Sequence, residues 1–155
     1  MGKTELDNCL MTLQPHIRFC HFKDSMLHLS QWSGRMDKEL MSVIVTVSAG
    51  SSHVPGKALQ SLQSFCNFLY ICQYQSHSMA MLTYLHNALK EFHSTKAIFL
   101  KTGARKGKKV INHFRLPKLC GLHAYEHLIP ELGSAPQFDT EITKHIHISD
   151  VKFLF

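Results

Sequence analysis

Two stretches decide the fold, KALQSLQSFCNFLYIC (57–72) and SMAMLTYLHNALKEFH (78–93), because each carries apolar residues at helical spacing. The apolar positions of the first stretch are Leu59, Leu62, Phe65, Cys66, Leu69 and Cys72, widened by Phe68 and Tyr70. Those of the second are Leu82, Leu85, Leu89 and Phe92. Ser78 is placed to cap the second helix, and only QYQSH separates the two stretches. We therefore predict a long antiparallel helical hairpin over about 57–101, closed by Gly103.

The region before the hairpin is predicted to hold short helices over 1–50. TELDNCLMTL (4–13) places leucines at helical spacing, and Pro15 follows it. A second element covers 35–47, where the β-branched run MSVIVTV favours a strand and the preceding DKEL favours a helix. The sequence leaves that choice open. AGSSHVPGK (49–57) has the composition of a linker.

The region after the hairpin is predicted to be a basic loop over 102–116 and a helical segment over 117–155. Pro117 suits the first position of a helix, which we expect to run to about Ile129, before Pro130. LGSAPQFD (132–139) is expected to be a loop, with Asp139 or Thr140 capping a final helix. The expected fold class is mainly α in a single unit, without a complete sheet.

Composition limits the kind of protein. The chain has 155 residues with 45% apolar and 18% charged residues, which is ordinary for one globular domain. No apolar run reaches the roughly 20 residues of a membrane helix, and MGKTELDN lacks the apolar core of a secretory signal. We expect an intracellular protein without a membrane partner. Five cysteines without a C-x-x-C pair indicate reduced, mostly packed thiols, and Cys66, Cys72, Met79 and Met81 are predicted to fill the core.

The positive charge is concentrated in one segment. Seven of the 17 basic residues fall within eighteen positions that hold no acidic residue: Lys101, Arg105, Lys106, Lys108, Lys109, Arg115 and Lys118. The other ten are balanced by 11 acidic residues, so the net charge of +6 resides in this segment. Such a patch suits contacts with a nucleic-acid backbone, and it is equally typical of a solvated loop.

One short motif points to zinc. His123, Glu126 and His127 spell H-x-x-E-H, in which two histidines would hold the metal and the glutamate would activate water. Cys120 would share a helical side with both histidines. A peptidase needs a further carboxylate ligand well downstream, and only 28 residues follow His127. We therefore expect no metal site, and keep Cys120, His123 and His127 as an alternative.

Several segments, in order, resemble the transposase of Plavaka-type fungal DNA transposons, relatives of the Kyakuja-Dileera-Zisupton and CACTA groups. These segments are HFKDSMLHLSQWSGRMDKEL (21–40), the stretch from ALQSLQSF to ARKGK (58–108), HFRLPKL (113–119), LGS (132–134) and TEITKHIHISDVK (140–152). No single segment is a specific motif. Their order and spacing carry the resemblance, which covers nearly the whole chain.

The resemblance implies a catalytic domain of ribonuclease H type in the parent family, with three acidic residues holding two Mg²⁺ ions for phosphoryl transfer. This chain would be the truncated C-terminal portion, with the helical insertion and the segment of the third acid. Glu141 matches one of two acids in the family pattern, whereas Lys144 replaces the other. Glu141 is thus the relict third acid, unless position 144 held the metal ligand.

We accordingly expect a degenerate, truncated transposase-like protein that relates to DNA transposition and is not an enzyme by itself. It would need no cofactor, although the parent family uses Mg²⁺. Expected partners are DNA and other transposase segments or copies, and an expressed chain would be nuclear. Two alternatives stay open. One is a host-retained helical module that binds DNA or a protein, and the other is a zinc-binding protein or metallopeptidase.

Overall fold

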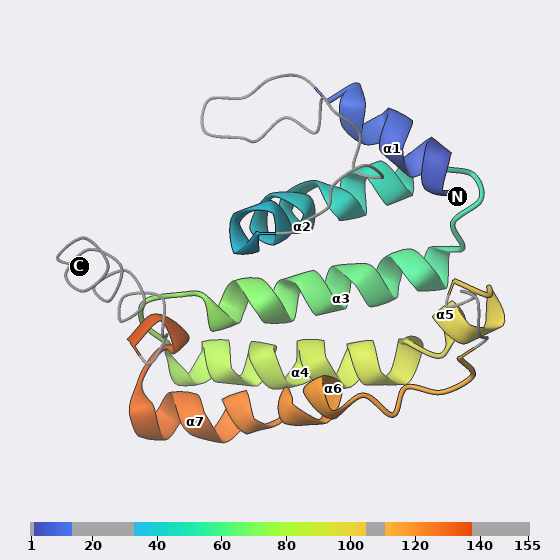
Figure 1. Ribbon diagram of the computed structural model, residues 1–155. Helices are drawn as coiled ribbons and strands as arrows, with labels where there is room; N and C mark the ends of the chain where they lie inside the picture. The colour runs from blue at the N-terminus through green and yellow to red at the C-terminus, as the bar shows by residue number, and fades with distance from the viewer. Residues whose placement is uncertain (1, 14–32, 105–110, 138–155) are drawn as a thin grey trace, which may run out of the picture.

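The computed structural model describes residues 2–13, 33–104 and 111–137, and within these residues it is helical without strands (Figure 1). The expectation of a mainly α fold is therefore confirmed for the described residues. The helices are α1 (Lys3–Met11), α2 (Gly34–Ala49), α3 (Gly56–Cys72), α4 (Met79–Thr95), α5 (Ile98–Lys101), α6 (Pro117–Gly121) and α7 (Ala124–Leu132), with a 3₁₀ turn at Ala135–Gln137. None of these helices is long and apolar enough to cross a membrane.

Helices α3 and α4 lie antiparallel and form the centre of the molecule (Figure 1). Ser78 caps α4 as predicted, because its Oγ accepts a hydrogen bond from the backbone N–H of Met81 at 3.3 Å. The main core consists of Phe68, Cys72, Leu85, Ala88, Leu89, Phe92 and, from α7, Ile129. Phe65 packs against Phe92, with ring centroids 4.7 Å apart and ring planes tilted by 32°. The two apolar stripes of the sequence therefore meet each other.

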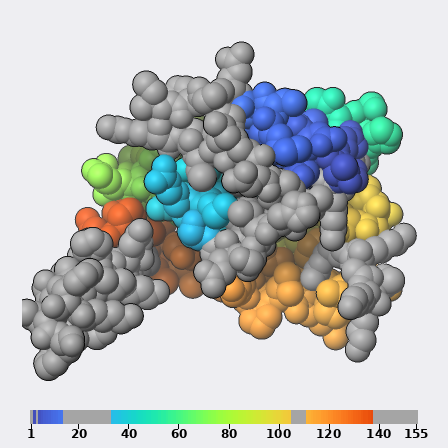
Figure 2. Space-filling model, turned by 45° about the horizontal axis from the view of Figure 1, so that its top comes forward, coloured from blue at the N-terminus to red at the C-terminus, as the bar shows by residue number. Residues whose placement is uncertain are grey.

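Helices α1 and α2 form a second, smaller core beside α3, and both reach the surface in Figure 2. Leu10 of α1 and Val47 of α2 are buried at its centre. Met36, Leu40 and Val43 of α2 pack against them, at intervals of three to four residues. This spacing explains why the β-branched run 43–47 is helical: only a helix directs these side chains to one side, toward α1.

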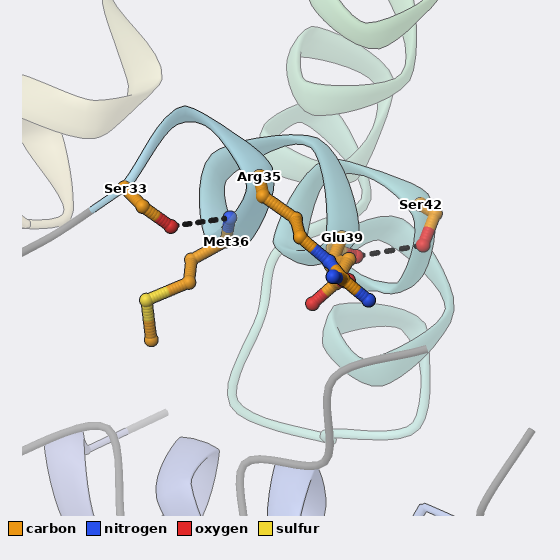
Figure 3. Close-up of polar contacts among 5 residues, drawn as sticks. All are labelled: Ser33, Arg35, Met36, Glu39 and Ser42. Atoms are coloured by element: carbon orange, nitrogen blue, oxygen red, sulfur yellow. Dashed lines mark hydrogen bonds and ion pairs between the residues drawn. The ribbon is translucent and has the colours of Figure 1, made fainter. Parts of the chain in front are cut away.

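The first turns of α2 are fixed by polar contacts (Figure 3). The Oγ of Ser33 accepts a hydrogen bond from the backbone N–H of Met36 at 3.3 Å. Glu39 is buried, and its Oε1 lies 2.9 Å from the Nε of Arg35, one turn earlier. The Ser42 hydroxyl donates to the Glu39 carbonyl at 2.6 Å. These contacts hold the N-terminal part of the helix that covers α3.

Gly103 ends the hairpin, as predicted from the sequence. It has a positive φ of 69°, which glycine adopts without the steric cost of a Cβ. Its N–H donates to the Leu100 carbonyl at 3.1 Å, and the N–H of Ala104 donates to the Phe99 carbonyl at 3.0 Å. This pair of bonds is a Schellman motif. It fixes the point from which the chain enters the basic segment.

The helix predicted over 117–129 is instead two helices, so that prediction is wrong. Pro117 does occupy the first position of α6, but α6 ends at Gly121. His123 occupies the N-cap position of α7 without a side-chain capping hydrogen bond, and α7 continues through Pro130 to Leu132. Pro130 lacks an N–H, so the carbonyl four residues earlier loses its helical partner, a loss tolerated here close to the helix end. The final helix expected after Asp139 lies outside the described residues.

The sulfur-containing residues follow the prediction only in the core. Cys66 and Cys72 are buried, and burial raises the pKa of the Cys72 thiol to about 12. Met79, by contrast, is 79% exposed in the first turn of α4, and Cys120 is exposed on α6. For Met79 the prediction of a core side chain is wrong, and Cys120 is a thiol that is not packed. Cys20 lies outside the described residues.

Candidate nucleic-acid interface

Three of the seven predicted phosphate-binding residues belong to the described part of the chain. Lys101 ends α5, Arg115 precedes α6, and Lys118 lies in its first turn. All three side chains are exposed, which a contact with nucleic acid requires. The remaining four, Arg105, Lys106, Lys108 and Lys109, lie outside the described residues.

The segment 111–116, which includes Arg115, runs back along α4 (Figure 1), and its residues form part of the surface coloured orange in Figure 2. Lys96 anchors this segment, since its Nζ lies 5.6 Å from the centroid of the Phe114 ring. The backbone N–H of Arg115 donates to Nδ1 of His113 at 3.2 Å. The segment is therefore held against α4 while the Arg115 side chain stays exposed.

The sequence between Glu91 and Glu126, which contains these cations, has no acidic residue. The same interval holds Lys96 in addition to the seven predicted cations. Lys90, just before it on α4, is also exposed. A stretch that is cationic over more than thirty positions gives a field of one sign, which attracts a polyanion.

Two of the three H-x-x-E-H residues, His123 and Glu126, contact α4 from α7. Glu126 is largely buried, and its Oε2 lies 3.2 Å from Nδ1 of His86 on α4. Its Oε1 lies 3.8 Å from Nδ1 of His123 and makes no hydrogen bond with the described residues, although it is buried. His127 is exposed. The glutamate thus joins two helices and two imidazoles.

His93 and Lys96 complete this group, which we call the histidine cluster: His86, His93, Lys96, His123 and Glu126. The His93 ring stacks on the His123 ring, with centroids 4.8 Å apart and planes at 11°. Lys96 Nζ donates to Nδ1 of His93 at 2.5 Å. The proton of a neutral His93 must then reside on Nε2, which is buried without an acceptor among the described residues.

The surroundings of His93 favour its neutral form. Burial lowers the pKa of His93 most, the charges of Lys96 and His123 lower it further, and Glu126 acts in the opposite direction. A neutral His93 can accept the Lys96 hydrogen bond, whereas a protonated ring cannot. The cluster is therefore built around one uncharged imidazole.

The alternative zinc site does not assemble among the described residues. Cys120 lies on α6, whereas His123 and His127 belong to the start and body of α7, so the three do not share one continuous helix. Within the described part of the chain, no three His, Cys, Asp or Glu side chains are placed to hold a metal ion. The relict acid Glu141, and Lys144, lie outside the described residues.

Sequence reasoning missed the histidine cluster. His86 and His93 are seven residues apart on α4, a spacing that places them on one side of the helix. Their partner Glu126, however, lies 40 residues after His86. Nothing local in the sequence connects the two, because the pairing depends on how α7 docks.

Comparisons with models of known protein families, with curated proteins and with solved structures found no match to this chain.

Proposed function

We propose that this chain is a transposase-like protein that binds DNA through the cationic stretch between Glu91 and Glu126, and that it does not catalyse phosphoryl transfer by itself. The observation that carries the proposal is the exposure of Lys101, Arg115 and Lys118 around a segment without acidic residues. The segments that resemble Plavaka-type transposases support the connection to DNA transposition.

DNA is the partner that this chemistry favours. Lysine and arginine side chains that replace the counterions of phosphates give a binding free energy that depends on salt and little on sequence. Lys96 and Phe114 hold the 111–116 segment in place, so Arg115 is presented from a fixed backbone. Fixed cations lose less conformational freedom on binding than cations on a free chain.

The proposal that the chain is not catalytic is supported by its lack, near the relict position in the sequence, of carboxylates that could surround two metal ions. Two-metal phosphoryl transfer needs several carboxylates within about 4 Å of both ions. Near the relict position the sequence offers Glu141 with Asp139 and Asp150, which are too close in sequence to surround two ions, and Lys144 adds a positive charge. Among the described residues, no three potential ligands gather.

DNA binding is tested with a fluorescein-labelled 20-base-pair duplex, by anisotropy at several salt concentrations. Replacing Lys106, Lys108 and Lys109 with glutamine should reduce the slope of log Kd against log salt by about 2–3, since each phosphate that is no longer neutralised lowers it by about 0.9. The control replaces Lys38 and Lys57, two exposed lysines outside the cationic stretch, and is compared with a variant in which only Lys106 and Lys108 are replaced, so that both lose the same charge. Equal reductions in both variants would mean that only net charge matters, and would refute this interface.

A separate experiment tests the proposal that the chain does not catalyse phosphoryl transfer. The purified chain, incubated with Mg²⁺ or Mn²⁺ and supercoiled plasmid, should give no more nicking than its Glu141→Gln variant. Metal-dependent nicking that disappears in this variant would overturn the proposal. Zinc analysis of the same preparation addresses the alternative, because one tightly held zinc per chain would contradict the arrangement of Cys120, His123 and His127.

A further inference from the structure

A groove between α3 and α4 is lined by aromatic and amide side chains. It has a volume of about 460 Å³, within the roughly 300–1,000 Å³ typical of binding pockets. The polar and aromatic residues that line it are Asn67, Tyr70, Tyr74, Tyr84, Asn87 and Glu91. We call it the tyrosine groove. Its described lining residues come from these two helices and from the start of the turn that joins them.

The tyrosine groove lies on the side of α4 away from the histidine cluster. Each residue advances a helix by about 100°, so residues two apart point in nearly opposite directions. Tyr84 and Glu91 line the groove, whereas His86 and His93 belong to the cluster. The groove is thus independent of the cationic stretch and of the proposed contact with DNA.

The aromatic rings of the groove are open to solvent. Tyr84 is 65% exposed, Tyr74 is 50% exposed and Tyr70 is 39% exposed. Three tyrosines gathered around one groove provide flat, rigid surfaces that bind a partner at low entropic cost. Their hydroxyls add polar groups at the rim, so the groove suits an occupant that is neither wholly apolar nor wholly charged.

Hydrogen bonds orient the polar side chains of the groove and leave some of their donors and acceptors available to a partner. The amide oxygen of Asn67 accepts a hydrogen bond from Nε2 of Gln63 at 2.8 Å, which orients the NH₂ group of Asn67 as a donor. Gln60 donates to Oε1 of Glu91 at 2.8 Å and holds this carboxylate across the two helices. Among the described lining residues, Glu91 is the one that is charged.

These features select the chemistry of the occupant. Both walls are helices, whose backbone groups are already paired, so the groove offers an extended peptide no backbone hydrogen bonds. Proline has no N–H, and proline-rich segments in the polyproline II conformation dock into grooves lined by aromatic residues. Their carbonyls can accept from Asn67. Glu91 favours a neighbouring arginine or lysine, and repels a phosphate.

Other occupants fit less well. An amphipathic helix needs several aliphatic contacts, and Ile71 and Ala88 are the aliphatic residues of the described lining. Single-stranded nucleic acid would stack on tyrosines, but it requires cations along its backbone, and the described lining has none. We propose that the tyrosine groove binds a proline-rich peptide segment that carries an arginine or lysine.

The probe is a fluorescein-labelled nonapeptide in which one arginine is flanked by proline triplets, titrated with the full chain and followed by anisotropy and by amide chemical shifts. Binding should shift the signals of 67–74 and 84–91. Tyr84→Ala should weaken it about tenfold, in the range for an aromatic anchor. The control Met79→Ala removes another exposed side chain of α4 that lies outside the groove, and should leave Kd unchanged.

The charge is tested by a pair of variants and a pair of peptides. Glu91→Gln should weaken binding of the arginine peptide about threefold, as for an exposed ion pair, and should not affect a peptide with glutamine in place of the arginine. Glu131→Gln, which removes an exposed carboxylate of α7, is the control.

Three results would overturn the proposal. The first is peptide binding that Tyr84→Ala does not weaken. The second is preferential binding of a labelled oligothymidine, with shifts at the same residues. The third is concentration-dependent dimerisation of the chain that Tyr84→Ala abolishes, because the groove would then serve a second copy.

Discussion

The two sides of α4 differ in how their polar groups are satisfied. On one side, which we call the covered side, α7 docks against α4 through the largely buried Glu126, and Phe114 contacts Lys96, whereas the rings of His86 and His123 stay more than half exposed. On the other side, the tyrosine groove has rings that face solvent. Side chains of similar polarity can therefore hold a fold together or remain available for a partner, depending on what docks over them.

The largest effect should come from the core that both sides share. Phe68 is fully buried between α3, α4 and α7, and its ring meets Tyr125 edge-on at 6.2 Å between centroids. Phe68→Ala should lower the free energy of unfolding by about 3–5 kcal/mol, through reduced apolar burial and the cavity left behind. Urea unfolding followed by circular dichroism measures this. A decrease below about 1 kcal/mol would mean that the two helices do not pack as described.

A smaller decrease in the free energy of unfolding should follow from removing the polar contacts of the covered side alone. Glu126→Ala removes the interactions with His86 and His123, and should lower the free energy of unfolding by about 1 kcal/mol, because both histidines are more than half exposed and solvent weakens each pair. Peptide binding to the tyrosine groove should not change. A Glu126→Ala variant as stable as the Glu131→Gln control would show that the cluster does not hold α7.

The covered side should also respond to pH. The folded state lowers the pKa of His93 below its ordinary value of 6.5, so the unfolded chain binds protons more readily as the pH falls. Stability contributed by neutral His93 is complete above about pH 6.5 and declines as the pH falls below that value. His93→Gln should therefore flatten the decline in stability between about pH 7 and pH 5, measured as the urea midpoint. A variant with an unchanged pH profile would contradict the lowered pKa.

The smallest effect on stability should come from the open side. Tyr84→Ala removes a ring that is mostly exposed, and should change the free energy of unfolding by less than about 0.5 kcal/mol. The same variant should nevertheless weaken binding of the arginine peptide. A large decrease in stability would show that the ring supports the helix pair, and that the groove is part of the fold.

The fold was predictable where the information is local. Apolar spacing and Ser78 located α3 and α4, and Gly103 marked the end of the hairpin because its conformation depends on its own backbone. The type of α2 could not be decided from MSVIVTV, because the deciding factor is contact with Leu10 of α1. The break between α6 and α7 could not be placed from the sequence, although Gly121 is the last residue of α6, because a single glycine does not decide whether a helix ends or continues.

The candidate interface was predictable for a different reason. Charge is a property of composition, so the cationic segment could be located without knowing the fold. The interactions that hold it against α4 could not, because Lys96 and Phe114 meet only when the chain turns back. The role of the H-x-x-E-H motif could not be predicted for the same reason: its glutamate is paired with His86, from another helix.

The described thiols give the molecule internal reporters of its own motions. Cys72 lies in the core between α3 and α4, whereas Cys120 is exposed on α6. An alkylating reagent reacts with thiolates, so the Cys72 thiol is protected both by exclusion and by its raised pKa, and becomes reactive only when the helix pair opens. Its labelling rate, relative to that of Cys120, therefore measures how often the centre of the bundle opens under native conditions. Mass spectrometry at successive times would follow both reactions in one sample.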